Sequence, residues 1–111
     1  MLDYDGRLFR AAGEGETDGS VARYHQDGKV LWGEFAGGQV RRGSIAGTVG
    51  PDGGLHFGYC MVLGDGDVIL GRCRSRPELL DDGRIRLTEQ WERYGPHAAT
   101  GVSYLEEIPA S

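Results

Sequence analysis

One acidic side chain lies between apolar neighbours on the same side of a predicted strand. Alternate residues of an extended chain point to the same side, and in segment 84–94 one side carries Ile85, Leu87, Glu89, Trp91 and Arg93. The apolar residues mark this as the inner side, so Glu89 is predicted to point inward. A carboxylate in such surroundings must accept hydrogen bonds, pair with a cation or become protonated. Glu89 is therefore the first candidate for a ligand anchor or a general acid or base.

Further polar and aromatic residues are predicted to surround Glu89. Tyr24, Gln26 and Ser103 would supply polar groups, while Phe35, Tyr24 and Trp91 would supply apolar walls. The predicted ligand-binding residues are therefore Tyr24, Gln26, Phe35, Glu89, Trp91 and Ser103. The alternative is a structural network, in which Glu89 accepts hydrogen bonds from Tyr, Ser or an inward Arg and fixes the strand register.

The other residues with reactive side chains predict neither a metal site nor a cofactor. Cys60 and Cys73 lack the paired C-x-x-C spacing of zinc sites, and His25, His56 and His97 are scattered along the chain. The glycine-rich run at 13–19 is not followed by a helix, so it does not match a phosphate-binding loop. We expect the two cysteines to be free thiols that fill small buried spaces.

Eight alternating segments, cut by turn residues, must position these side chains. They span residues 6–12, 20–26, 30–36, 40–49, 55–62, 68–75, 84–94 and 101–108. Residues 77–82 are the only stretch that could form a turn of helix. Short connections favour pairing between successive strands, and closure removes exposed edges. The sequence therefore predicts one all-β domain, residues 1–111: an antiparallel up-and-down meander of eight strands closed into a barrel.

The turn residues also predict how two hairpins pair. With Asp27-Gly28 as the loop, Tyr24 would lie opposite Leu31 and point inward. With the loop of the later hairpin centred on residues 65 and 66, Cys60 and Cys73 would be diagonal neighbours on one face. The alternation leaves open which face of segments 55–62 and 68–75 is the inner one. Because both faces are partly apolar, we expect a homodimer or homotetramer.

Composition excludes several classes of protein. The formal net charge is −5 and the pI about 5.1, whereas a general nucleic-acid binder carries a basic face. The chain starts without the apolar segment of a signal peptide, and it has no apolar run of the length that spans a membrane. We expect a cytoplasmic protein that contacts neither nucleic acid nor membrane.

Several motifs in order resemble a known family. They include YDGRLFR (4–10), WGEFAGG (32–38), LGRCRSRPE (70–78) and DGRIRLTEQWE (82–92). Together they resemble the small bacterial avidin-like barrel proteins, many of which are labelled N-acetylglutamate synthase. The resemblance implies an eight-stranded avidin-like or calycin-like barrel. The enzyme name does not transfer, because an acetyl-coenzyme A-dependent synthase needs a larger α/β fold. A weaker likeness to MORN repeats lacks their steady period.

Three functions are compatible with these residues. The first is a binding module that holds a small, partly apolar molecule in the barrel. The second is a small barrel enzyme, of isomerase or cyclase type, with acid–base chemistry at Glu89. The third is a structural protein that oligomerises through segments 55–62 and 68–75 and has no ligand site.

Overall fold

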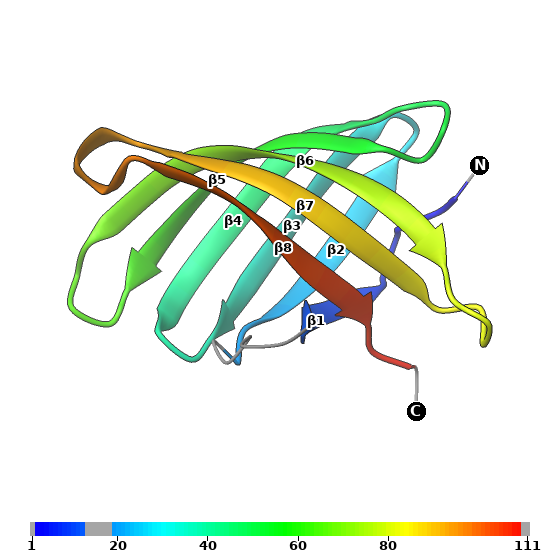
Figure 1. Ribbon diagram of the computed structural model, residues 1–111, viewed down its shortest axis with the longest axis horizontal. Helices are drawn as coiled ribbons and strands as arrows, with labels where there is room; N and C mark the ends of the chain where they lie inside the picture. The colour runs from blue at the N-terminus through cyan, green and yellow to red at the C-terminus, as the bar shows by residue number, and fades with distance from the viewer. Residues whose placement is uncertain (1, 13–18, 110–111) are drawn as a thin grey trace.

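The computed structural model describes residues 2–12 and 19–109 as a closed antiparallel barrel in which each strand pairs with the next and β8 pairs with β1 (Figure 1). The strands are β1 (Leu8–Ala12), β2 (Val21–Asp27), β3 (Val30–Gly37), β4 (Val40–Val49), β5 (Leu55–Leu63), β6 (Val68–Leu79), β7 (Ile85–Tyr94) and β8 (Ala99–Glu107). A single 3-10 turn, η1 (Gly95–His97), connects β7 to β8. The predicted eight-stranded up-and-down barrel is confirmed.

Residues 77–82, the one stretch that could have formed a turn of helix, do not form one. β6 continues through this stretch to Leu79, and Pro77 lies opposite Leu87 in the ladder with β7. Proline already has a backbone angle that a strand tolerates, although it contributes no N–H to the ladder. Pairing along the whole length of β7 therefore outweighs the weak local preference for helix.

The loop of the β2–β3 hairpin lies one residue later than predicted, which moves the pairing along β3 by two residues. Asp27 pairs with Val30, so the loop is Gly28-Lys29, and Tyr24 lies opposite Gly33 instead of Leu31. Gly28 takes a positive φ of 61°, which suits the first loop position of a two-residue hairpin turn. The predicted loop would have required a positive φ at Asp27, at a steric cost that Gly28 avoids. Tyr24 still points inward and is 2% exposed.

The predicted register of the β5–β6 hairpin is wrong as well, here by one residue. Val62 pairs with Val68, which places Cys60 opposite Leu70 and Cys73 opposite Phe57. A shift of one residue changes which side chains share a face, so Cys60 is on the outer surface and Cys73 is buried inside. Both thiols are free, as predicted, but only one of them is buried.

This register decides which faces of β5 and β6 point inward. Leu55, Phe57 and Met61 of β5 are buried, as are Ile69 and Ser75 of β6. The outer faces of both strands keep large apolar side chains, which include Val62, Val68 and Leu70.

The two ends of the barrel differ. At the plugged end, where the β2–β3, β4–β5 and β6–β7 connections lie, residues 2–7 cross the opening. Tyr4 is fully buried there, and its hydroxyl donates a 2.6 Å hydrogen bond to the carbonyl of Gly53. The opposite end carries the β3–β4, β5–β6 and β7–β8 connections, and we call it the open end. In Figure 1 the plugged end is on the right, with both chain ends.

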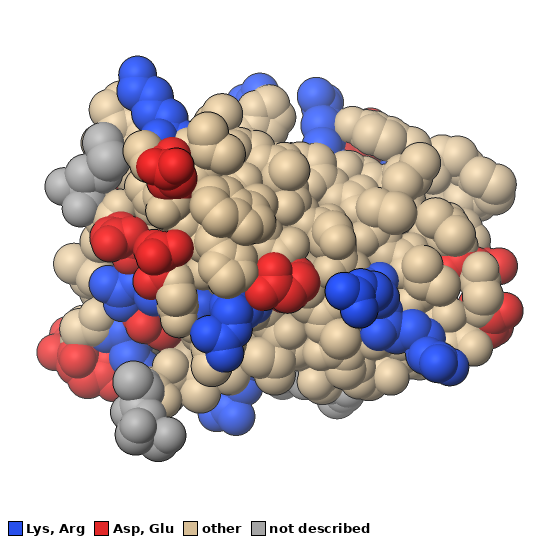
Figure 2. Space-filling model, turned by 180° about the vertical axis from the view of Figure 1, so that it is seen from behind, with Lys and Arg blue, Asp and Glu red and all other residues tan. Residues whose placement is uncertain are grey.

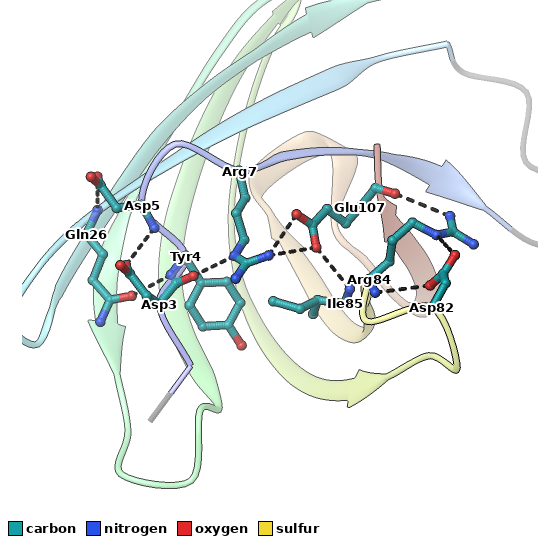
Figure 3. Close-up of polar contacts among 9 residues, drawn as sticks. All are labelled: Asp3, Tyr4, Asp5, Arg7, Gln26, Asp82, Arg84, Ile85 and Glu107. Carbon is teal, nitrogen blue, oxygen red and sulfur yellow. Dashed lines mark hydrogen bonds and ion pairs between the residues drawn. The ribbon is translucent and has the colours of Figure 1, made fainter. Parts of the chain in front are cut away.

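Polar contacts fasten the plug to the barrel wall (Figure 3). Arg7 forms an ion pair of 2.8 Å with Glu107 of β8, and the same carboxylate accepts a hydrogen bond from the backbone N–H of Ile85. The side-chain oxygen of Gln26 accepts a hydrogen bond from the N–H of Tyr4 at 2.9 Å. These contacts tie the start of the chain to β2, β7 and β8.

Candidate functional site

A cavity of about 280 Å³ occupies the barrel interior toward the open end. Its floor is aromatic, with Phe9, Tyr24 and Phe57 among its members, and polar groups interrupt the apolar wall at Glu89 and Arg93. The volume approaches that of ordinary small-molecule sites, which begin near ~300 Å³. It corresponds to the liquid volume of about nine water molecules. The cavity is therefore large enough for one small ligand.

Glycines beneath three aromatic rings keep this cavity open. Phe35, Tyr59 and Trp91 are half-buried and line the cavity, and each lies opposite a glycine of the neighbouring strand. The cross-strand pairs are Phe35 with Gly43, Tyr59 with Gly71 and Trp91 with Gly101.

The space above each glycine is filled by the ring itself. A Cβ at Gly43 would lie 2.5 Å from Cε1 of Phe35, and one at Gly101 would lie 2.7 Å from Cε2 of Trp91. Both separations are well inside van der Waals contact. Glycine therefore allows each ring to lie along the barrel wall, so that the rings border the lumen without filling it.

Glu89 contributes a carboxylate to the cavity wall, held by two donors from β6. The Ser75 hydroxyl donates to Glu89 Oε2 at 3.2 Å, and the Cys73 thiol donates to the same oxygen at 3.5 Å. Burial, and then the charge of Glu89, raise the pKa of the Cys73 thiol. The thiol is consequently protonated near neutral pH and acts as a donor, not as a nucleophile.

Tyr24 is a neutral phenol in the floor of the cavity. Burial raises its pKa well above the ordinary tyrosine value, and the negative charge of Glu89 raises it further. Its ring packs against Phe9 with a centroid separation of 4.9 Å. Tyr24 therefore forms part of the apolar floor.

Arg93 lies at the other end of the inward face of β7. Its guanidinium carbon is 5.1 Å from the ring centroid of Trp91, the geometry of a cation–π contact. Burial raises the pKa of Tyr59, and the positive charge of Arg93 and a hydrogen bond from it oppose this rise. Its Nε atom is buried and has no hydrogen-bond partner among the residues that the structure describes.

Four of the six predicted site residues line the cavity: Tyr24, Phe35, Glu89 and Trp91. Gln26 does not, because its side chain binds the N–H of Tyr4 and the carbonyl of Gly28 at the plugged end. Ser103 lies opposite Glu89 on β8 but is not part of the cavity wall.

Five polar residues of the cavity wall lie outside the predicted site: Ser20, Gln39, Tyr59, Cys73 and Arg93. Arg93 could have been included from the sequence, because strand alternation places it on the same inner face of β7 as Glu89. Cys73 and Tyr59 were hidden by the undecided faces of β5 and β6.

The outer surface is mixed in charge. Figure 2 shows one face of the barrel, on which acidic and basic side chains are interspersed instead of gathering by sign. Within residues 2–12 and 19–109, no cluster of three or more metal-ligating side chains is present, and no helix is long and apolar enough to cross a membrane.

The chain is similar to one described protein family. Residues 2–108 match the family described as avidin-like protein. No curated protein matches the chain, and no solved structure does.

Proposed function

Because the chain belongs to the avidin-like protein family, we propose that its barrel binds a small, partly apolar molecule in the open-end cavity. One observation carries this proposal: three aromatic rings lie flat on glycines and leave about 280 Å³ unfilled. Close packing is the rule in protein interiors. An unfilled cavity bordered by aromatic rings is the kind of space in which a small molecule can bind.

The residues divide into walls and an anchor. Phe35 and Trp91 offer flat apolar faces near the mouth, and Tyr24 forms the floor. Glu89 is the polar anchor, and the two donors on β6 fix one of its oxygens in place. A rigid carboxylate in a mostly apolar cavity orients a ligand that carries a hydrogen-bond donor.

The test is a binding screen with small aromatic compounds of about ten non-hydrogen atoms, observed by ligand NMR. Glu89→Gln keeps the shape of the side chain and removes its charge, so we expect about tenfold weaker binding of donor-bearing compounds. Glu92→Gln is the matched control, because Glu92 is on the same strand but pairs with Arg72 on the outer face.

Two results would contradict the proposal. One is a screen in which no compound binds the unmodified protein. The other is equal weakening by Glu89→Gln and Glu92→Gln, which would show that binding does not involve the cavity. The acid–base hypothesis for Glu89 stays a prediction, as does the predicted cytoplasmic location.

We also propose that two copies associate through the outer face of β5, β6 and β7. Leu70 lies between Cys60 and Tyr94 in register and is 51% exposed, and the neighbouring pair Val62 and Val68 is also exposed. An apolar patch of this kind marks a contact surface.

Light scattering after size exclusion tests this proposal. Leu70→Glu is expected to convert the oligomer to a monomer. Leu79→Glu is the control, because Leu79 is 61% exposed but lies at the far end of β6, away from the patch. A monomeric unmodified protein at micromolar concentration would refute the proposal.

A further inference from the structure

We propose that the ligand is a small carboxylate that carries an aromatic ring, bound with its carboxylate at Arg93 near the mouth and its ring against Trp91. This inference rests on the proposed function and specifies the chemistry of the same cavity.

Arg93 brings a positive charge to the cavity wall. Arg7, Arg72 and Arg84 each form an ion pair with a carboxylate. Arg93 lines the cavity and forms no ion pair within the part of the chain that the structure describes. The buried Nε atoms of Arg93 and Arg86 both have no hydrogen-bond partner there, but only Arg93 of the two lines the cavity. A carboxylate that binds in the cavity would pair with the charge that Arg93 brings to its wall.

The shape of the guanidinium narrows the choice of anion. Its planar fork of N–H donors matches a carboxylate in a bidentate arrangement. The contact between Arg93 and Trp91 holds the guanidinium close to the indole. An anion bound to Arg93 thereby has a flat apolar surface beside it, which favours an anion that carries a planar ring.

The order of charges along β7 fixes the orientation of the ligand. Glu89, Trp91 and Arg93 are alternate residues of one face, so the outer two are separated by about 13 Å along the strand. A carboxylate is attracted to Arg93 and repelled by Glu89. The acid end therefore lies at Arg93, and a hydroxyl or N–H at the opposite end of the ring points toward Glu89.

A suitable probe is 3-(4-hydroxyphenyl)propanoate, which has about the number of atoms that the cavity can hold. Its primary amide removes the charge and keeps the size. 3-Phenylpropanoate removes the donor and keeps the charge.

The protein itself offers a reporter. The chain has two tryptophans, and Trp32 is on the outer surface, stacked on His25. In a Trp32→Phe background the fluorescence of Trp91 reports occupancy of the cavity. Titrations in this background compare Arg93→Met with Arg72→Met, which removes an equal charge from the outer face.

We expect the acid to bind about tenfold more tightly than its amide. Arg93→Met should remove this preference, and Arg72→Met should retain it. 3-Phenylpropanoate should bind more weakly than the hydroxylated acid, and Glu89→Gln should reduce that difference.

The contrary outcomes separate the two proposals. If the amide binds as tightly as the acid, or if Arg93→Met keeps the preference for the acid, the inference is wrong and the proposed function stands. If neither compound changes the emission of Trp91 and the NMR screen also finds no ligand, both are wrong.

Discussion

The plugged end and the open end are built from the same eight strands, yet one is filled and the other is hollow. Leu31, Ile85 and Leu87 meet Tyr4 in the interior near the plugged end, and all four are fully buried. Toward the open end, glycines lie opposite the large rings, and the rings lie against the wall. The two ends therefore differ in what occupies the lumen: Tyr4 of the plug fills it at one end, and at the other the rings lie against the wall and leave it open.

Polar groups show the same contrast. At the plugged end, Arg7 and Glu107 satisfy one another, and Glu107 also holds the N–H of Ile85. At the open end Arg93 lines the cavity and forms no ion pair within the described part of the chain. One end uses its charges for stability, and the other presents them to the cavity.

The largest expected effect is a cavity in the packed section. Leu87→Ala should lower the free energy of unfolding by about 3 kcal/mol, because a fully buried side chain loses its contacts and leaves a void. Phe35→Ala should cost less, since one face of that ring already borders the cavity. Urea unfolding of both variants measures the difference, and equal losses would show that the two sections are packed alike.

An intermediate effect is expected when a glycine beneath a ring is filled. Gly101→Ala should destabilise the protein by about 1–3 kcal/mol, because the added methyl forces Trp91 into the lumen. Gly58→Ala is the control, since a Cβ there would meet only the carbonyl of Gly71 at an ordinary 3.7 Å. Thermal unfolding should separate the two variants, and similar melting temperatures would remove the argument from the glycines.

The smallest effect concerns the plug and depends on pH. Tyr4→Phe removes the hydrogen bond to Gly53, at a cost of about 1 kcal/mol at neutral pH. Burial raises the pKa of Tyr4 from 10.0 to about 12, so the unfolded chain releases this proton at a lower pH than the folded one. The stability linked to Tyr4 is therefore complete below pH 10 and is lost as the pH rises toward 12.

The stability gap between the unmodified protein and Tyr4→Phe should accordingly narrow above pH 10. Urea unfolding at neutral pH and at several pH values above 10 measures the gap. Tyr24 titrates in the same direction in both proteins, so it does not contribute to the difference. A gap that stays constant with pH would mean that the Tyr4 hydroxyl is accessible to solvent.

Much of the fold could be predicted from the sequence because strand alternation is a local signal. Period-two patterning was sufficient to place Glu89 and Trp91 on the inner face of β7. Hairpin register was not accessible in the same way, since it depends on whether Asp27 or Gly28 takes the positive φ. A shift of one residue at β5–β6 was enough to put Cys60 on the wrong side.

The polar part of the site was harder to predict for a different reason. Gln26 is on the inner side of its strand, but its partner is the N–H of Tyr4, in a segment with no strand pattern. Arg93 is near the end of a strand, where a long charged side chain ordinarily reaches solvent. Tertiary contacts of this kind leave no periodic trace in the sequence.

The position of the chain ends has a practical consequence. β1 and β8 are neighbours, and the N–H of Ile108 donates to the carbonyl of Leu8 near the plugged end. Both ends leave from that side (Figure 1). A fusion partner or a tether to a solid support, attached at either terminus, would therefore leave the mouth facing the solution. The barrel is thus suited to being displayed in one orientation.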